Sequence, residues 1–305
     1  MIPDSFVLSP EVTQAQSQGR AIVALETAVI THGLPQPVNL QLGRELESII
    51  RGQGAAPATI GLIDGCVHVG LSDAELQFLA TASDLRKISR RDFGVALARH
   101  ESGGTTVAGT LIAARTAGLR VFATGGIGGV HRAAPFDVSA DLEELGRSPL
   151  VVVCAGAKSI LDLPSTLEVL ETHGVPVVGF QTDEFPAFFS THSGLPVTAR
   201  AGSPAAVAQI ARAQWDAGIE AAVLVVVSPP AEAALPADEI ESAIEQALAE
   251  AAEKGIHGSS VTPFLLGRVG ELSHGASMQA NLALLHNNAR VAAQIAIELE
   301  KISNS

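Results

Sequence analysis

Residues 119–159 read LRVFATGGIGGVHRAAPFDVSADLEELGRSPLVVVCAGAKS and contain two short apolar runs that end in small and polar residues. The run 119–123 leads into Thr124 and a glycine-rich turn, and the run 150–155 leads into Lys158. Such runs are typical of buried strands that open into loops. Because ligands bind at the carboxyl ends of strands in open α/β sheets, we expect a glycine-lined anion site and a lysine to meet there.

Strands and helices alternate on both sides of this stretch. The apolar segment 22–28 predicts a central strand, 221–227 predicts a buried strand, and apolar residues recur at helical spacing from Val38 to Gly52. Two apolar runs joined by Asp64-Gly65 predict a hairpin with a type I′ turn. The pattern predicts one domain, 1–305, with a three-layer α/β/α fold and a mixed, largely parallel central sheet.

Other segments carry weaker but definite signals. We predict a capping box at Ser72, strands at 86–89 and 176–180, and an irregular segment 181–198. We also predict helices over 105–117, 164–173, 203–218, 238–254 and 277–302, and a further helix that begins at Thr262-Pro263.

The composition limits the classes of function. A net charge of -13 argues against general binding to nucleic acid or to a membrane surface, both of which are anionic. The two cysteines cannot form a disulfide framework, which fits a reducing compartment. The amino-terminal residues lack the pattern of a signal peptide, and the longest apolar run is far below the roughly 18 residues of a membrane span. We therefore expect a cytoplasmic protein.

Lys158 and Glu26 are the main candidates for chemistry. An amine at the end of an apolar strand can act as a nucleophile and form a Schiff base; the alternatives are a strand cap or a phosphate-binding cation. Glu26 interrupts an apolar strand, so we expect a buried carboxyl group that needs a partner. Such a group can serve as a general acid or base, and a structural ion pair is an equally good interpretation.

The glycine-rich turn after Thr124 could present backbone amides to a phosphate, and His131-Arg132 directly after it strengthens that interpretation. It matches neither the dinucleotide fingerprint nor the P-loop. Thr105 and Thr106 could add hydroxyl groups at a helix amino terminus, or could simply cap that helix.

Three further sets of residues each have two possible interpretations. Asp137 and Asp141, four residues apart, suggest either a hydrated divalent-cation site or a helix cap with an acidic first turn, and the spacing favours the cap. Lys87 belongs to a basic run that is either a solvated face or reaches a phosphate. Asn287 and Asn288 lie within the last predicted helix and either face solvent or point into a site.

The sequence resembles the pseudouridine-5′-phosphate glycosidase family, also called indigoidine synthase A-like. The resemblance runs in order along nearly the whole chain. Its segments are 23–27, 31–35, 87–92, 104–108, 122–132, 136–142, 153–162, 179–182, 262–266 and 287–288.

The resemblance implies reversible cleavage of the C–C glycosidic bond of pseudouridine 5′-phosphate to uracil and ribose 5-phosphate. It also implies one divalent metal ion per subunit, usually manganese, and a homotrimer. By position, Lys158 resembles the nucleophile of the family and Glu26 its proton donor. The remaining positions implied by resemblance are the metal ligand Asp137, the phosphate-facing Thr124, Gly125 and Gly126, and the substrate-binding Lys87, Val107, His131, Ser139, Ala140, Asp141 and one of Asn287 or Asn288.

Two other functions compete with this one. A Schiff-base aldolase or another lyase acting on a sugar phosphate would share the lysine and the phosphate site, but would release no uracil. A non-catalytic nucleotide-sensing protein would have lost the amine or the acid, and Lys158, Glu26 and Asp141 are all present.

Overall fold

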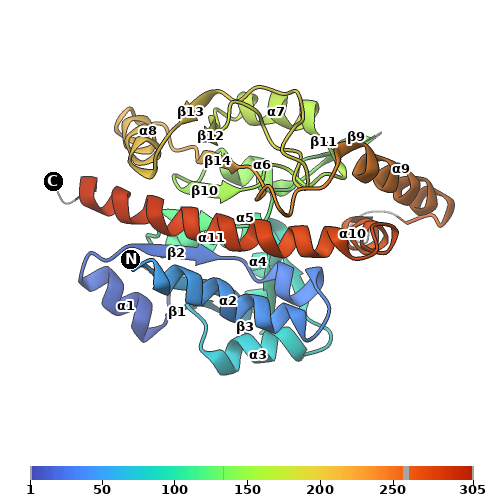
Figure 1. The fold of residues 1–305 in the computed structure, drawn as a ribbon. Helices are drawn as coiled ribbons and strands as arrows, with labels where there is room; N and C mark the ends of the chain where they lie inside the picture. Colours follow the sequence, from blue (N-terminus) through green and yellow to red (C-terminus); the bar gives the residue numbers. More distant parts are fainter. Residues whose placement is uncertain (1, 133, 257–260, 304–305) are drawn as a thin grey trace.

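The computed structural model describes residues 2–132, 134–256 and 261–303 (Figure 1). Within these residues the main sheet has eleven strands, and its principal order is β1-β4-β3-β2-β7-β10-β14-β12-β13. The strands β6 and β5 join beside β3. Helices cover both faces, so the predicted three-layer fold with a mixed, largely parallel sheet is confirmed.

The part of the sheet from β2 to the far edge is parallel throughout, and all of it except the edge strand β13 is almost fully buried. Its strands are β2 (Ile22–Leu25), β7 (Val121–Ala123), β10 (Val151–Cys154), β14 (Val223–Val227), β12 (Val177–Phe180) and β13 (Ala199–Ala201). Every residue of β2, β7, β10 and β14 is buried. Strands buried on both faces need continuous apolar runs, which explains why the sequence displays them so clearly.

The amino-terminal edge contains the antiparallel pairs. The predicted hairpin joins β3 (Ala56–Ile63) to β4 (Cys66–Val69), with Asp64 and Gly65 both at positive φ, as a type I′ turn requires. β6 (Gly103–Thr105) also runs antiparallel to β3. Two short strands, β1 (Phe6–Leu8) and β5 (Arg86–Ile88), pair in parallel with β4 and β6.

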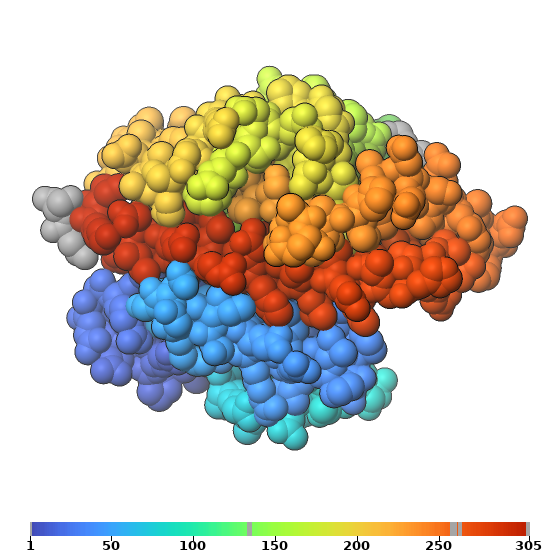
Figure 2. Space-filling view, in the orientation of Figure 1, coloured from blue at the N-terminus to red at the C-terminus, as the bar shows by residue number. Residues whose placement is uncertain are grey.

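The helix α11 (Ala276–Ser303) crosses one face of the sheet and packs on β2, β7 and β10 (Figure 1). It also contacts α2 (Val38–Gly52) and α8 (Pro204–Asp216). In Figure 2 it forms a red band across the surface, between blue amino-terminal residues and the yellow and orange segments. On the other side, α5 (Val107–Thr116) packs on β2 and β3 and contacts α6 (Ala140–Leu145).

The remaining elements surround this framework. They are α1 (Pro10–Ser17), a π-helical turn (Val29–Gly33), α3 (Asp73–Thr81), a 3-10 turn (Arg90–Asp92), α4 (Phe93–Ala98), α7 (Leu163–Thr172), α9 (Ala237–Glu253), α10 (Val261–Leu272) and a small antiparallel sheet of β8 (Val130–His131), β9 (Ala134–Val138) and β11 (Leu161–Asp162).

The predicted strand 22–28 ends at Leu25, so Glu26 follows the strand and does not interrupt it. A second difference from the predicted elements lies at Thr105. The expected helix 105–117 begins at Val107, because Thr105 pairs with Ile88 at the end of β6 and the Thr106 side chain caps the helix. Likewise, α10 begins at Val261, one residue before the predicted start. The capping box at Ser72 is confirmed. In the part of the chain described, no helix is long and apolar enough to cross a membrane.

Candidate functional site

The site lies where three neighbouring strands end. Glu26 follows β2, Thr124 follows β7, and Lys158 comes four residues after β10. These strands are adjacent in the order β2-β7-β10 and all are parallel, so their carboxyl ends meet at one edge of the sheet. The strands that precede Glu26 and Lys158 therefore lie close together, with β7 between them.

The Glu26 carboxylate accepts a hydrogen bond from the Thr124 hydroxyl, so the predicted partner of this carboxyl group is a neutral side chain. Burial raises the pKa of Glu26 above its ordinary value. The positive charges of Lys158 and Lys87 and the Thr124 hydrogen bond oppose this rise, and the negative charge of Asp141 adds to it. A carboxyl group with a raised pKa retains its proton nearer to neutral pH, as a proton donor must.

Lys87 reaches the same place from a different element. It lies on β5 opposite Gly104 of β6, and burial together with the positive charge of Lys158 lowers its pKa. Glu26 and Asp141 act in the opposite direction on this amine. Lys158 and Asp141 thus act electrostatically on both Glu26 and Lys87, and we call these four residues the charge cluster.

Asp141 is a buried member of the charge cluster. Its carboxylate contacts the protein backbone. Its side chain is 6% exposed and lies in the first turn of α6. One oxygen, Oδ1, accepts from the Ala108 amide at 2.9 Å, and Oδ2 accepts from the Gly128 amide at 2.8 Å. The carboxylate thus joins the amino terminus of α5 to the glycine-rich loop.

Several amides of that loop are already engaged within the protein. The Thr124 amide donates to the Val153 carbonyl at 3.0 Å, and the Ile127 amide donates to the Gly156 carbonyl at 3.1 Å. Within the described residues, the Gly125 and Gly126 amides have no protein acceptor. Of the three residues expected to face a phosphate, these two keep their backbone donors available.

Asn288, and not Asn287, contacts this loop. Its side-chain amide donates to the Thr124 carbonyl at 2.8 Å and the Gly125 carbonyl at 3.4 Å. The Asn288 side chain is 1% exposed, and its Oδ1 has no hydrogen-bond partner among the described residues. Asn287 is half-buried and accepts from Arg290. Asn281, seven residues earlier on the same helical face, also lies beside Gly125 and went unnoticed in the sequence.

Thr105 and Thr106 use their hydroxyl groups inside the protein. The Thr105 hydroxyl donates to the Ile60 carbonyl at 2.8 Å and accepts from Thr110, and the Thr106 hydroxyl accepts from the Gly109 amide at 3.3 Å. Val107, directly after them, is 1% exposed. Thr106 thus caps the helix, as the simpler alternative predicted, whereas Thr105 forms hydrogen bonds within the core, which was not predicted.

The segment after the glycine-rich loop has mixed roles. Ser139 caps α6 by accepting from the Asp141 amide at 3.3 Å, and Ala140 begins that helix. His131 is half-buried in β8. Arg132 was expected to strengthen an anion site, but its guanidinium donates to the Ser159 carbonyl at 2.9 Å and also pairs with Glu241. It therefore holds the loop that carries Lys158.

Asp137 is exposed on β9. Among the described residues, no group of three or more His, Cys, Asp or Glu side chains could hold a metal ion. A single carboxylate fits only an ion that keeps most of its coordination sphere for water and substrate, as hard divalent cations often do.

The fold and the charge cluster together define a three-layer α/β protein with paired acids and amines at the carboxyl edge of its sheet. A profile of the family described as Indigoidine synthase A like protein matches residues 11–298. The chain belongs to this family.

Named relatives and solved structures resemble the chain over nearly its whole length. The pseudouridine-5′-phosphate glycosidase of Herpetosiphon aurantiacus is 52% identical, covering 96% of this chain and 98% of the relative. That of Chloroflexus aurantiacus is 53% identical, covering 97% and 99%. The prealnumycin C-glycosynthase AlnA, in a crystal structure with ribulose 5-phosphate, has a TM-score of 0.92 at 38% identity and 99% coverage of both chains. An indigoidine synthase A-like protein from Thermotoga maritima has a TM-score of 0.89 at 37% identity, covering 97% of this chain and 96% of that one.

Proposed function

We propose that this protein reversibly cleaves the C–C glycosidic bond of pseudouridine 5′-phosphate, giving uracil and ribose 5-phosphate. The observation that carries the proposal is the charge cluster, which brings an acid and two amines to the sheet edge where ligands bind. The names of the full-length relatives support the reaction. A family neighbour that binds ribulose 5-phosphate supports a sugar phosphate as ligand.

The leaving atom in this reaction is carbon C5 of uracil, which is a poor anion. In the proposed route the C1′–O4′ bond breaks, O4′ takes up a proton, and the Lys158 amine bonds to C1′. The C1′–C5 bond then breaks, its electron pair takes up a proton at C5, and C1′ remains as an imine on Lys158. Water hydrolyses the imine and releases ribose 5-phosphate.

Glu26 is the proposed proton donor in both protonation steps, and it regains its proton between them from the Lys158 amine, which loses one as it bonds to C1′. Its raised pKa keeps the carboxyl group protonated to a higher pH, and the Thr124 hydrogen bond fixes its orientation. The phosphate would bind the Gly125 and Gly126 amides, with Lys87 as a nearby cation. Binding of the remote phosphate would position C1′ against the amine.

Manganese, a homotrimer and a cytoplasmic location complete the proposal. Asp137 would hold the metal ion, which would supply positive charge at the polar end of the site. Phe136, next to it, is 99% exposed, and an apolar side chain of this kind favours coverage by another subunit. Light scattering tests the trimer. Turnover unaffected by a chelator would remove the metal from the proposal.

Two assays test the reaction and its covalent step. Incubating uracil with ribose 5-phosphate should produce the C-nucleotide, and borohydride should trap a sugar phosphate on Lys158. Lys158→Ala should abolish both, whereas Lys301→Ala, an exposed lysine paired with Glu298, should leave both unchanged. Adduct formation without any nucleotide would favour the Schiff-base aldolase or another sugar-phosphate lyase.

A further inference from the structure

We propose that His32 is a positioning residue, which holds Lys87 in the charge cluster by binding the backbone at the start of β5. The kinetic part of this inference rests on the proposed function, in which Lys87 is the cation near the phosphate. The hydrogen bond between His32 and the strand is a property of the fold, so it can be tested without the reaction.

His32 lies in the π-helical turn Val29–Gly33, which begins three residues after Glu26. The Thr31 amide donates to the Thr27 carbonyl at 2.9 Å, so the turn starts directly from the segment that carries the acid. π-helical turns are rare and occur frequently at functional sites. This turn continues from the end of β2 to the beginning of β5, and it therefore connects two elements that each supply a member of the charge cluster.

Each nitrogen of the His32 ring has a hydrogen-bond partner. Nε2 lies 3.1 Å from the Leu85 carbonyl oxygen, and Nδ1 lies 2.6 Å from the Thr31 hydroxyl. Because a carbonyl oxygen can only accept, Nε2 carries a proton and donates it to Leu85. The ring thus joins its own turn to the residue that directly precedes β5.

The ring makes this contact in its neutral form. Burial lowers the pKa of His32, as does the positive charge of Lys87, and the hydrogen bond to Leu85 opposes this change. In the neutral ring the unprotonated Nδ1 accepts from the Thr31 hydroxyl. His32 therefore binds the strand without placing another positive charge beside Lys87.

The turn contacts the backbone on two sides of Lys87. Leu85 lies two residues before Lys87, and Gly104 of β6 is paired with it. A Cβ atom at Gly104 would lie only 2.2 Å from Thr31 Oγ1, so the turn also packs closely on β6. Since β5 has only three residues, its register depends on such contacts at its ends.

The position of the Lys87 amine matters because several charges act on it at once. Lys158, Glu26 and Asp141 all change its pKa. Coulomb interactions at these short separations vary steeply with distance, so a small shift of β5 alters each of them. The same shift would move the cation away from the phosphate that it is proposed to bind.

Three substitutions of His32 separate the contact with β5 from the bulk of the ring. His32→Gln places an amide donor near the position of Nε2, His32→Asn places one near Nδ1, and His32→Ala has neither. His68 of β4 is a matched control, because it is also half-buried and its Nδ1 lies 2.8 Å from a Glu75 carboxylate oxygen. It is not among the groups that shift the pKa of Glu26 or Lys87.

Hydrogen exchange tests the contact without activity. The Arg86 amide donates to the Ser102 carbonyl at 3.0 Å, and peptides that cover 85–88 report on this pairing. These peptides should exchange faster in His32→Ala and His32→Asn, and at the wild-type rate in His32→Gln and His68→Ala. Equal exchange in the Gln and Asn variants would overturn the proposal, since reaching Leu85 would then make no difference.

Steady-state kinetics with ribose 5-phosphate and uracil test the consequence for Lys87. We expect His32→Ala to raise KM for ribose 5-phosphate about tenfold while kcat falls less than about threefold, with recovery in His32→Gln. In a Lys87→Ala background, His32→Ala should change KM by less than about twofold, because the residue through which it acts is absent.

The outcomes distinguish this inference from the proposed function. Effects of His32→Ala and Lys87→Ala that simply add would show that His32 acts independently of Lys87 and overturn the positioning role. If the Ala and Asn variants do not fold while His68→Ala does, His32 supports the whole fold and the specific role also fails. A wild-type protein without the reaction would instead refute the proposed function, and hydrogen exchange would still decide whether His32 holds β5.

Discussion

The Thr124 hydroxyl donates a hydrogen bond to the Glu26 carboxylate, although the two residues are 98 positions apart in the chain. They meet because β2 and β7 are adjacent parallel strands, with Leu25 paired to Ala123, so the next residue of each strand lies at the same level. The hydrogen bond favours the ionised carboxylate and limits the rise in pKa that burial imposes on Glu26.

Replacing Thr124 should therefore change the pH dependence of the reaction. Thr124→Val has nearly the same shape but no hydroxyl, so the pKa of Glu26 should rise further, and the alkaline limb of the rate profile should move to higher pH. Loss of orientation should also lower kcat by roughly tenfold. Thr124→Ser keeps a hydroxyl and should retain the wild-type profile. A profile identical in Val and Ser variants would show that this hydrogen bond does not control the acid.

The raised pKa of Glu26 also predicts how stability depends on pH. The folded protein binds this proton more tightly than the unfolded chain, whose carboxyl pKa is about 4.3. Unfolding therefore releases a proton between that value and the folded pKa, and this group makes the protein less stable as the pH rises through that window. The loss is complete above the folded pKa.

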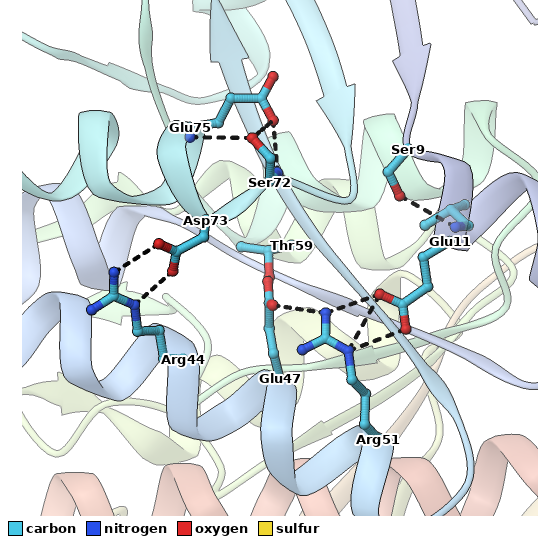
Figure 3. A network of polar contacts seen from close by, with 10 residues as sticks. Ser9, Glu11, Arg44, Glu47, Arg51, Thr59, Ser72, Asp73 and Glu75 are labelled. Atoms are coloured by element: carbon cyan, nitrogen blue, oxygen red, sulfur yellow. Dashed lines mark hydrogen bonds and ion pairs between the residues drawn. The ribbon is translucent and has the colours of Figure 1, made fainter.

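Glu26→Gln removes the ionisable group and should cancel that loss. Its melting temperature should match wild type near pH 4 and exceed it at pH 8, even while the variant is inactive. Calorimetry across this range measures the difference. Arg44 and Asp73 form an exposed ion pair, and neither is among the groups that shift the pKa of Glu26, so Asp73→Asn should show no such gain at high pH (Figure 3). A constant difference between Glu26→Gln and wild type would contradict the assignment.

Alanine substitutions of the two neighbouring asparagines of α11 should have different effects on the free energy of unfolding. Asn288→Ala leaves the Thr124 carbonyl without its donor, whereas the Gly125 carbonyl still accepts from the Ala155 amide, so we expect a loss of about 1–3 kcal/mol in the free energy of unfolding. Turnover should fall as well, because the loop that follows β7 loses its support. Asn287→Ala should change stability by less than about 0.5 kcal/mol. Denaturant titration of both variants makes the comparison, and equal effects would refute it.

The sequence predicted best the features that depend on local pattern. Continuous apolar runs identified β10 and β14, because a strand buried on both faces requires apolar residues throughout. Asp64-Gly65 identified the hairpin, because the positive φ angles of its turn favour these residues. Glu26 was also detectable, since a carboxyl group within an apolar run is conspicuous, although the strand ends at Leu25 and Glu26 follows it. The roles that the family resemblance implies for Glu26 and Lys158 required the two residues to meet.

Contacts between distant segments were not predictable. The segment 137–141 favoured a helix cap with an acidic first turn, and this is confirmed, because Ser139 caps α6 and Asp141 lies in its first turn. The two amides of other elements that donate to Asp141 left no mark in the sequence. Arg132 follows a glycine-rich loop, which suggested an anion site. Its guanidinium instead donates to backbone carbonyls of the loop that carries Lys158. Thr105 was assigned to a helix because a three-residue strand containing two glycines has no recognisable pattern.

The close approach at Gly128 yields the last prediction. Gly128→Ala would place a methyl group within 2.8 Å of Asp141 Oδ2 and 2.3 Å of Ser139 Oγ, so the loop or the first turn of α6 must shift. We expect a loss of about 1–3 kcal/mol in the free energy of unfolding, the usual cost of overpacking, and a larger loss of activity than of stability. Gly267→Ala is the control, because it lies inside α10 with no atom within 4 Å of the new Cβ and should stabilise the protein by about 0.5–1 kcal/mol. Thermal unfolding and turnover measured on both variants decide the matter: wild-type activity in Gly128→Ala would show that the loop has room to move and that its contact with α6 does not position the site.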